Sequence, residues 1–171
     1  KSAIGPAAIL FELAWIAEDR AQAEKVPELL ESALEALASD DSQAELVQQK
    51  LRRRGDWNLL VRVLNARLAV LDRNRVRARV YGELADVYAN HLDNQGEAMD
   101  MLLKAVESDP SAPLFHDLVA TLGSQIGRYD EYVTLLDQLL EKSRRDVDAL
   151  TRCEILLRLV RVNLEVRADL D

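Results

Sequence analysis

The sequence predicts an all-α fold of about nine helices, which form antiparallel pairs stacked into a solenoid. Two observations lead to this prediction. The first is composition: 49% of the 171 residues are apolar, with Leu, Ala and Val dominant, whereas Gly (6) and Pro (4) are scarce. Unbranched side chains lose little rotamer freedom in a helix, so this composition favours helix throughout. The second is an internal repeat with a period of about 34 residues, which is typical of stacked helical hairpins.

The repeat is clearest in the second half of the chain. Its best copy contains Tyr81-x2-Leu84-Ala85-x2-Tyr88, Ala98-x3-Leu102-x2-Ala105 and Pro110. The same positions stay apolar one period later, as Phe115, Leu118, Val119, Leu122, Tyr132, Leu136 and Leu139. A second pair of copies with the same offset runs from Leu10 and from Ala44. The step from Ala44 to Tyr81 is longer than this period, which predicts a longer helix in the middle.

These spacings resemble the signature of the tetratricopeptide repeat (TPR) family. That signature has a large residue, a Leu, a small residue and an aromatic on a first helix, then small, large and small residues on a second helix and a closing Pro. Gln48 and Arg67 depart from it, because the family prefers small residues there. The resemblance implies one right-handed α-solenoid domain over residues 1–171. Its approximate repeats are 6–40, 42–73, 75–110, 112–143 and, as a terminal half repeat, 146–171.

Local signals predict the individual helices. We expect them over 6–23, 27–38, 43–53, 57–72, 75–91, 96–108, 112–126, 129–142 and 147–168. Three prolines fall in first turns, where a missing N–H costs nothing: Pro6, Pro27 and Pro113. Three residues suit N-caps, since a side-chain oxygen can accept from a free backbone N–H: Ser42, Asp56 and Asp146. Three glycines are expected in the turns inside the pairs: Gly55, Gly96 and Gly127.

Charge and cysteine content restrict the function classes. The net charge of −8 argues against a general binder of nucleic acid or anionic membranes. The one cysteine, Cys153, fits a reducing compartment. No stretch approaches the roughly 20 apolar residues of a membrane span. We therefore expect a cytoplasmic protein without membrane insertion, similar to bacterial repeat scaffolds, and take Lys1 as the start of a piece of a longer protein.

The sequence offers no set of catalytic residues, so we predict no enzyme activity, no cofactor and no metal. His91 and His116 lie far apart in different repeats, without a second ligand at helical spacing. Phosphate-binding, dinucleotide-binding and nucleophile-elbow motifs are missing. Cys153 lies in an apolar helix and is expected to be a small core thiol.

Two aromatic residues of the first helix, Phe11 and Trp15, allow two interpretations. They are four positions apart and therefore share a helix face. By the TPR resemblance this face lines the concave groove, where the rings would anchor a bound peptide. The alternative is burial, which we favour because residues 7–17 are apolar nearly all round the helix. An exposed apolar first helix would instead support self-association as a homodimer.

The same register assigns the other groove positions to the first helix of each pair. The partner-binding candidates are Phe11, Trp15, Glu45, Gln49, Arg52, Arg53, Arg79, Asp86, Asn90 and His116, with Ala120, Ser124, Arg152 and Arg158 in the same register. The Lys and Asn that clamp a terminal carboxylate in chaperone-binding TPR proteins are missing from these places.

Residues 50–79 form a basic segment, with ten Lys or Arg against two Asp, between two acidic flanks. Three interpretations are open. The favoured one is a solvated surface whose charges pair with neighbouring repeats. The second is docking of an acidic protein surface. The third, RNA binding, is weakened because the segment lacks interleaved aromatics that stack on bases. The sequence therefore predicts a non-catalytic scaffold that binds a partner protein or peptide, with nucleic-acid binding and self-association as alternatives.

Overall fold

The computed structural model describes residues 5–39, 43–146 and 149–168, and every regular element in these ranges is helical. The chain divides into two units, Lys1–Asp72 and Arg73–Asp171. The first contains α1 (Pro6–Asp19), the short 3-10 helix η1 (Ala23–Lys25), α2 (Val26–Ser39), α3 (Ala44–Arg54) and α4 (Trp57–Val70). The second contains α5 (Asn74–His91), α6 (Gln95–Ser108), α7 (Pro113–Ile126), α8 (Tyr129–Asp146) and α9 (Ala149–Ala168).

The predicted all-α class is confirmed, and so is the longer middle helix. Helix α5 has 18 residues and is longer than the helices on either side of it in sequence, α4 and α6, which have 14 each. Pro6 and Pro113 are the first residues of α1 and α7, as predicted. Asp56 caps α4, since its Oδ1 accepts from the N–H of Leu59 at 3.2 Å. The prediction of an N-cap at Asp146 is wrong, because α8 continues to this residue, and Ser42 lies outside the described residues.

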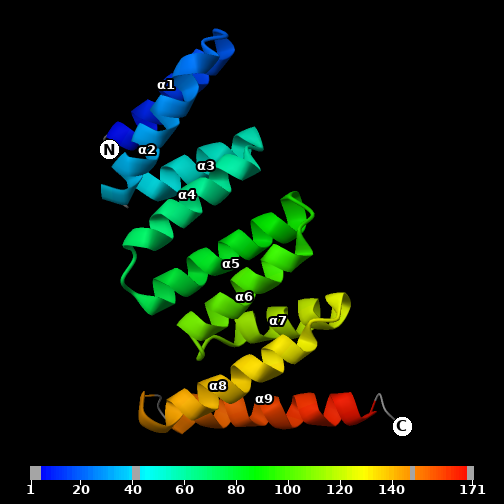
Figure 1. Cartoon of the computed structure of the whole chain (residues 1–171). Coiled ribbons are helices and arrows are strands. Elements are labelled where there is room, and N and C mark those ends of the chain that lie inside the picture. Colours follow the sequence, from blue (N-terminus) through cyan, green and yellow to red (C-terminus); the bar gives the residue numbers. More distant parts are fainter. Residues whose placement is uncertain (1–4, 40–42, 147–148, 169–171) are drawn as a thin grey trace. The chain divides into compact units, whose positions relative to one another are not determined.

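In the unit of residues 1–72, α1 packs along α2, and α2 also packs along α4 (Figure 1). Helices α3 and α4 form a second pair, and α1 contacts α3. The core between them consists of fully buried side chains from α1, α3 and α4, among them Phe11, Leu51, Leu60 and Leu64. The two helix pairs of this unit therefore pack on one another through α1 with α3 and α2 with α4.

In the unit of residues 73–171, α5 and α6 form a close pair, and α6 also packs on α7 (Figure 1). Helix α7 continues to α8 and α8 to α9 in the same way. Leu84, Met99, Leu136 and Ile155 are fully buried. Arg128 lies in the turn between α7 and α8. Its guanidinium links this turn to α6 by donating to the carbonyl oxygen of Gly96 and to Oδ1 of Asp100.

The turn inside each helix pair contains one residue with a positive φ angle. These residues are Ala21 (56°), Gly55 (72°), Asp93 (50°) and Gly127 (71°), and they are the positive-φ residues of the described ranges. Inside each unit the two turn residues are one sequence period apart, Ala21 with Gly55 and Asp93 with Gly127. A left-handed residue just after a helix lets the following N–H groups return to the free carbonyls of the last turn. The repeat is therefore visible in the backbone as well as in the sequence.

Two local predictions are wrong because a residue other than glycine takes the left-handed conformation in the turn. Helix α1 ends at Asp19 and not at residue 23, because Ala21 takes the left-handed conformation and the N–H of Gln22 returns to the carbonyl of Ala17 at 2.9 Å. Gly96 is not in a turn but in the first turn of α6. Asp93 occupies the turn position instead, although a side chain makes the left-handed region costly.

The conformation of Ala21 leads to a stability prediction. Ala21→Gly should raise the free energy of unfolding of the 1–72 unit by about 1 kcal/mol, because glycine adopts positive φ without a clash with Cβ. Gly55→Ala should lower it by a similar amount. Both tryptophans, Trp15 and Trp57, belong to this unit, so urea unfolding followed by tryptophan fluorescence measures it directly.

The matched control is Ala36→Gly, an identical replacement inside α2. It should destabilise by about 1 kcal/mol, because glycine is unfavourable in a helix interior. A loss of stability in Ala21→Gly equal to that in Ala36→Gly would contradict the left-handed turn.

Candidate partner-binding cleft

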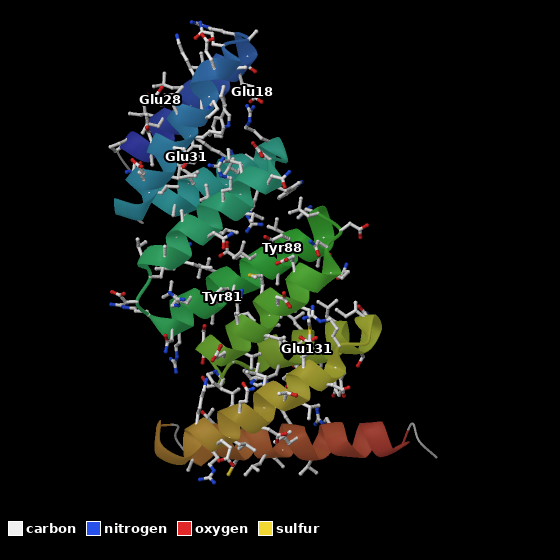
Figure 2. The ribbon with its side chains drawn as sticks, in the orientation of Figure 1. Glu18, Glu28, Glu31, Tyr81, Tyr88 and Glu131 are labelled. Atoms are coloured by element: carbon white, nitrogen blue, oxygen red, sulfur yellow. The ribbon has the colours of Figure 1, made fainter. Side chains whose placement is uncertain are left out.

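An open cleft of about 310 Å³ lies in the unit of residues 73–171, between α5, α6 and α7. Its floor combines small residues, Gly82, Ala85 and Ala89 on α5 and Ala98 on α6, with the buried side chains of Leu102 and Leu122. Helix α5, which forms one wall of the cleft, carries Tyr81 and Tyr88, and both are labelled in Figure 2. Small side chains leave room here that larger ones would fill. The volume is at the lower end of the range typical of ligand sites.

Gly82 allows α7 to approach α5 closely at one end of the cleft. A Cβ added at this position would lie 2.6 Å from Cε1 of Phe115, which is closer than any real contact. The aromatic ring of α7 therefore packs on bare backbone of α5. This contact determines how far apart the two helix walls of the cleft stand.

The rim of the cleft is polar and exposed. Asn90 donates to Oδ1 of Asp86 at 2.8 Å on α5, and Thr121 and Gln125 face the cleft from α7. Gln95, at the start of α6, donates to a backbone carbonyl of α5 at 3.2 Å. Amide and hydroxyl groups both donate and accept hydrogen bonds, so this rim suits the N–H and C=O groups of a polypeptide backbone.

A larger depression of about 380 Å³ lies between α6 and α8 in the same unit. Its carboxylates already have partners. Asp100 and Glu131 each lie 2.6 Å from Nη2 of Arg128, and Glu107 lies 2.9 Å from Nζ of Lys142. Because these charges are engaged and the surface is more open, we regard the α5–α6–α7 cleft as the better candidate.

Some of the partner-binding residues predicted from the sequence line this cleft, and others do not. Asp86 and Asn90 line the cleft, and Arg79 is exposed on α5 one turn before Gly82. The prediction chose the wrong side of α7. The cleft is lined from α7 by Leu118, Thr121, Leu122 and Gln125, and not by His116, Ala120 and Ser124.

His116 is a structural residue and not a surface one. It is 1% exposed, with Nδ1 2.8 Å from the hydroxyl oxygen of Tyr132 and Nε2 2.9 Å from the carbonyl oxygen of Pro110. The carbonyl can only accept, so Nε2 carries the proton and Nδ1 accepts from Tyr132. Burial raises the pKa of Tyr132 to about 12, so its hydroxyl keeps the proton that it donates. The prediction that His116 faces a partner is therefore wrong.

Phe11 and Trp15 are also buried, at 0% and 6% exposure, with ring centroids 6.1 Å apart. The guanidinium of Arg54 covers the Trp15 ring at 4.8 Å from its centroid. The burial interpretation therefore holds, and neither ring is available as a peptide anchor. Helix α1 is apolar nearly all round because its opposite side carries a second, exposed apolar stripe.

The remaining candidates lie on α3, in the unit of residues 1–72. Glu45, Gln49 and Arg53 are exposed, and Arg52 is partly exposed. All four belong to one helix of that unit.

Charged residues of the basic segment pair with acidic residues of α1 and α2. Lys50 pairs with Glu12, Arg54 lies 3.7 Å from Glu18, and Arg62 pairs with Glu31. Glu18 and Glu31 are labelled in Figure 2. These pairs link neighbouring helices of the 1–72 unit, as the favoured interpretation of the basic segment expected. Exposed pairs of this kind contribute little stability each.

Cys153 is exposed, so the prediction of a core thiol is wrong. The buried face of α9 is formed by Thr151, Ile155 and Leu159, spaced one helical turn apart, and Cys153 lies on the other side of the helix. Among the described residues, no group of three or more His, Cys, Asp or Glu side chains is placed to hold a metal ion. No helix in these ranges is both long and apolar enough to cross a membrane.

The chain matches no protein-family model, and no curated protein matches it. The resemblance to the TPR family therefore remains a prediction from residue spacing.

The environment of His116 leads to a prediction on pH. Burial lowers its pKa below the ordinary value of about 6.5, so below that pH the unfolded chain binds the proton more readily than the folded one. Stability should be constant above about pH 6.5 and fall as the pH drops from 6.5 toward the folded-state pKa. Arg158, Asp117 and Glu154 also face the ring, and their charges have smaller effects.

Two measurements check this expectation. An NMR titration of the imidazole carbons in a His91→Gln variant, which retains His116 alone, should give a midpoint below 6.5. Urea unfolding followed by circular dichroism should show the matching decline in stability in acid. A titration midpoint at or above 6.5 would contradict the neutral, doubly hydrogen-bonded histidine.

Proposed function

We propose that this chain is a non-catalytic binding module, built as a TPR-like α-solenoid, that holds a segment of a partner protein in the α5–α6–α7 cleft. The observation that carries the proposal is the cleft itself, with a floor of small residues and a rim of backbone-compatible polar groups. Such a combination suits a bound polypeptide, because apolar side chains fill the floor while the rim satisfies the backbone.

The helix arrangement supports a solenoid. Hairpin turns of one type recur one sequence period apart inside each unit, and each pair packs on its neighbour within the unit. Helix α6 runs back between α5 and α7, so these two walls of the cleft run in the same direction. A helical or extended segment can therefore lie lengthwise between them.

The ion pairs of the basic segment favour a protein partner over RNA. The charges of Lys50, Arg54 and Arg62 are compensated by acids of the same unit, so fewer counterions remain to be released on binding a phosphate backbone.

Blocking the cleft tests the proposal. Thr121→Trp places a bulky ring on the exposed rim and should reduce partner capture from native lysate at least tenfold, because the ring occupies the space of the bound segment. The amount of each captured protein is measured by quantitative mass spectrometry against the wild-type chain.

The matched control is Thr134→Trp. Both threonines are exposed and donate to the carbonyl four residues earlier, to Asp117 at 2.8 Å and to Asp130 at 2.9 Å, but Thr134 lies in the α6–α8 depression. Partners lost with Thr134→Trp and retained with Thr121→Trp would refute the cleft as the binding site.

A second candidate function is self-association through α1. Ile9, Leu13 and Ile16 follow one another at helical spacing and are each nearly half exposed, although the opposite side of the helix, with Phe11 and Trp15, is buried. A stripe of large apolar side chains on a surface favours association with another apolar surface. An equivalent stripe of a second copy would cover it symmetrically.

Sedimentation equilibrium tests this candidate. The wild-type chain should sediment as a dimer, and Leu13→Glu should weaken dimerisation at least tenfold by placing a charge in the apolar contact. Leu13 is a suitable test position because its side chain is exposed, whereas a charge at the buried Trp15 would unfold the unit. Val70→Glu on α4, of similar exposure, is the control and should leave the dimer intact. A monomeric wild-type chain would exclude this function.

A further inference from the structure

The outward face of α5 continues beyond the cleft toward the start of the helix. Arg75, Arg79, Gly82, Asp86 and Asn90 are spaced by four, three, four and four residues, and therefore lie along one side of the helix. The last three line the cleft. The first two extend the same stripe with positive charge, and the side chain of Arg75 is 81% exposed.

The positions of these arginines are unfavourable for the helix alone. The first turns of α5 hold Arg75, Arg77 and Arg79 after Arg73, and no acidic residue stands in the first turn. The N-terminal end of a helix carries partial positive charge, so cations there are destabilising. Arg75 and Arg79 are also like charges four apart on one face, which adds repulsion. A bound anionic group would offset both the unfavourable interaction with the helix end and the repulsion between the two arginines, because it attracts both side chains.

Among the described residues, Arg75 and Arg79 have little compensating negative charge. Arg75 lies 3.9 Å from Oδ2 of Asp109, whose other carboxylate oxygen accepts from the N–H and hydroxyl of Ser111. Arg77 turns to the hydroxyl of Tyr81 at 3.2 Å. The ion pairs found among the described residues include none to Arg79. Arg54 and Arg62 of the 1–72 unit differ, since acids of neighbouring helices pair with them.

Large apolar side chains lie beside this basic end. Phe115 touches Gly82, so the start of α7 is next to the middle of α5. From that start Leu114 is 62% exposed and Leu118 is 43% exposed. Because α5 and α7 run in the same direction, Leu114 lies toward the Arg79 end of the cleft. The surface thus offers positive charge and apolar area together.

We infer that the cleft takes an acidic–apolar segment of a partner protein, with carboxylates at Arg75 and Arg79 and a large apolar side chain against Leu114 and Leu118. This inference rests on the proposed function and adds the chemistry of the partner. Asp86 stands one turn beyond Gly82 in the same stripe, so the segment is acidic at one end only. A nucleic-acid strand fits less well, because its regular phosphates would meet the Asp86 carboxylate.

Because the chain has a net charge of −8, an acidic segment would bind only where positive charge is concentrated locally. A chain with such a charge repels acidic molecules in general, so attraction must come from the local arginines. Binding should therefore depend on these side chains and weaken with added salt, which screens exposed charges over about 8–10 Å at physiological ionic strength.

Fluorescence anisotropy with the full chain and defined probes tests the inference. The first probe is a labelled peptide in which three glutamates precede a Leu-Ala-Phe segment. The second carries lysines in place of the glutamates, and the third carries serines in place of Leu and Phe. The fourth is poly-uridine RNA of similar length. The first probe should bind about tenfold or more tightly than each of the others.

Charge reversal identifies the site. Arg75→Glu/Arg79→Glu should weaken the first peptide at least tenfold, because two attractions become repulsions. Lys104→Glu/Arg152→Glu makes the same change in net charge at exposed positions of α6 and α9, and should leave binding within about twofold. Leu118→Ala should weaken binding, whereas Leu156→Ala, which has matching exposure on α9, should not. Circular dichroism confirms that each variant stays helical.

The outcomes separate this inference from the proposed function. If the lysine peptide binds best and Thr121→Trp abolishes it, the cleft binds a polypeptide but the acidic partner is wrong. Preferential binding of RNA that the double reversal removes would assign the arginines to nucleic acid and overturn the inference. Binding of none of the peptides would overturn it too, and would leave lysate capture by the cleft as a separate result.

Discussion

The tight turn inside each helix pair is the constraint on which the rest of the structure depends. One left-handed residue ends the first helix and lets the chain reverse within a few residues, so the second helix must lie antiparallel and close. Each pair then has an apolar side that it cannot bury alone, and within each unit the next pair covers it. The cleft arises from the same geometry, because α6 returns between α5 and α7 and leaves their outward sides on one surface.

Much of the fold could be predicted from the sequence, because helix limits depend on local chemistry. Proline at the first position, an Asp cap and a regular repeat period are all readable from residue types alone. The failures fall where tertiary packing overrides local preference. Ala21 and Asp93 hold a conformation that glycine prefers, and Gly96 is in a helix, so glycine positions did not mark the turns reliably.

The cleft was only partly predictable. Asp86 and Asn90 follow from the helical register of α5, whereas the wall from α7 does not. A histidine in a helix looks like a surface residue, but the hydroxyl of Tyr132 and the carbonyl of Pro110 satisfy both ring nitrogens of His116 and allow its burial. Turning His116 inward rotates Leu118 and Thr121 toward the cleft. No local pattern contains that information, because it depends on which distant groups meet the ring.

The contact of Phe115 with Gly82 has a consequence for how this protein can change over time. A Cβ at position 82 would lie 2.6 Å from Cε1 of Phe115, so the ring or α7 itself must move before any other residue fits there. The exposed rim residues, by contrast, can vary without cost to the core. Exchanges among the rim side chains would therefore change the chemistry of the cleft while the contact between Gly82 and Phe115 stays as it is.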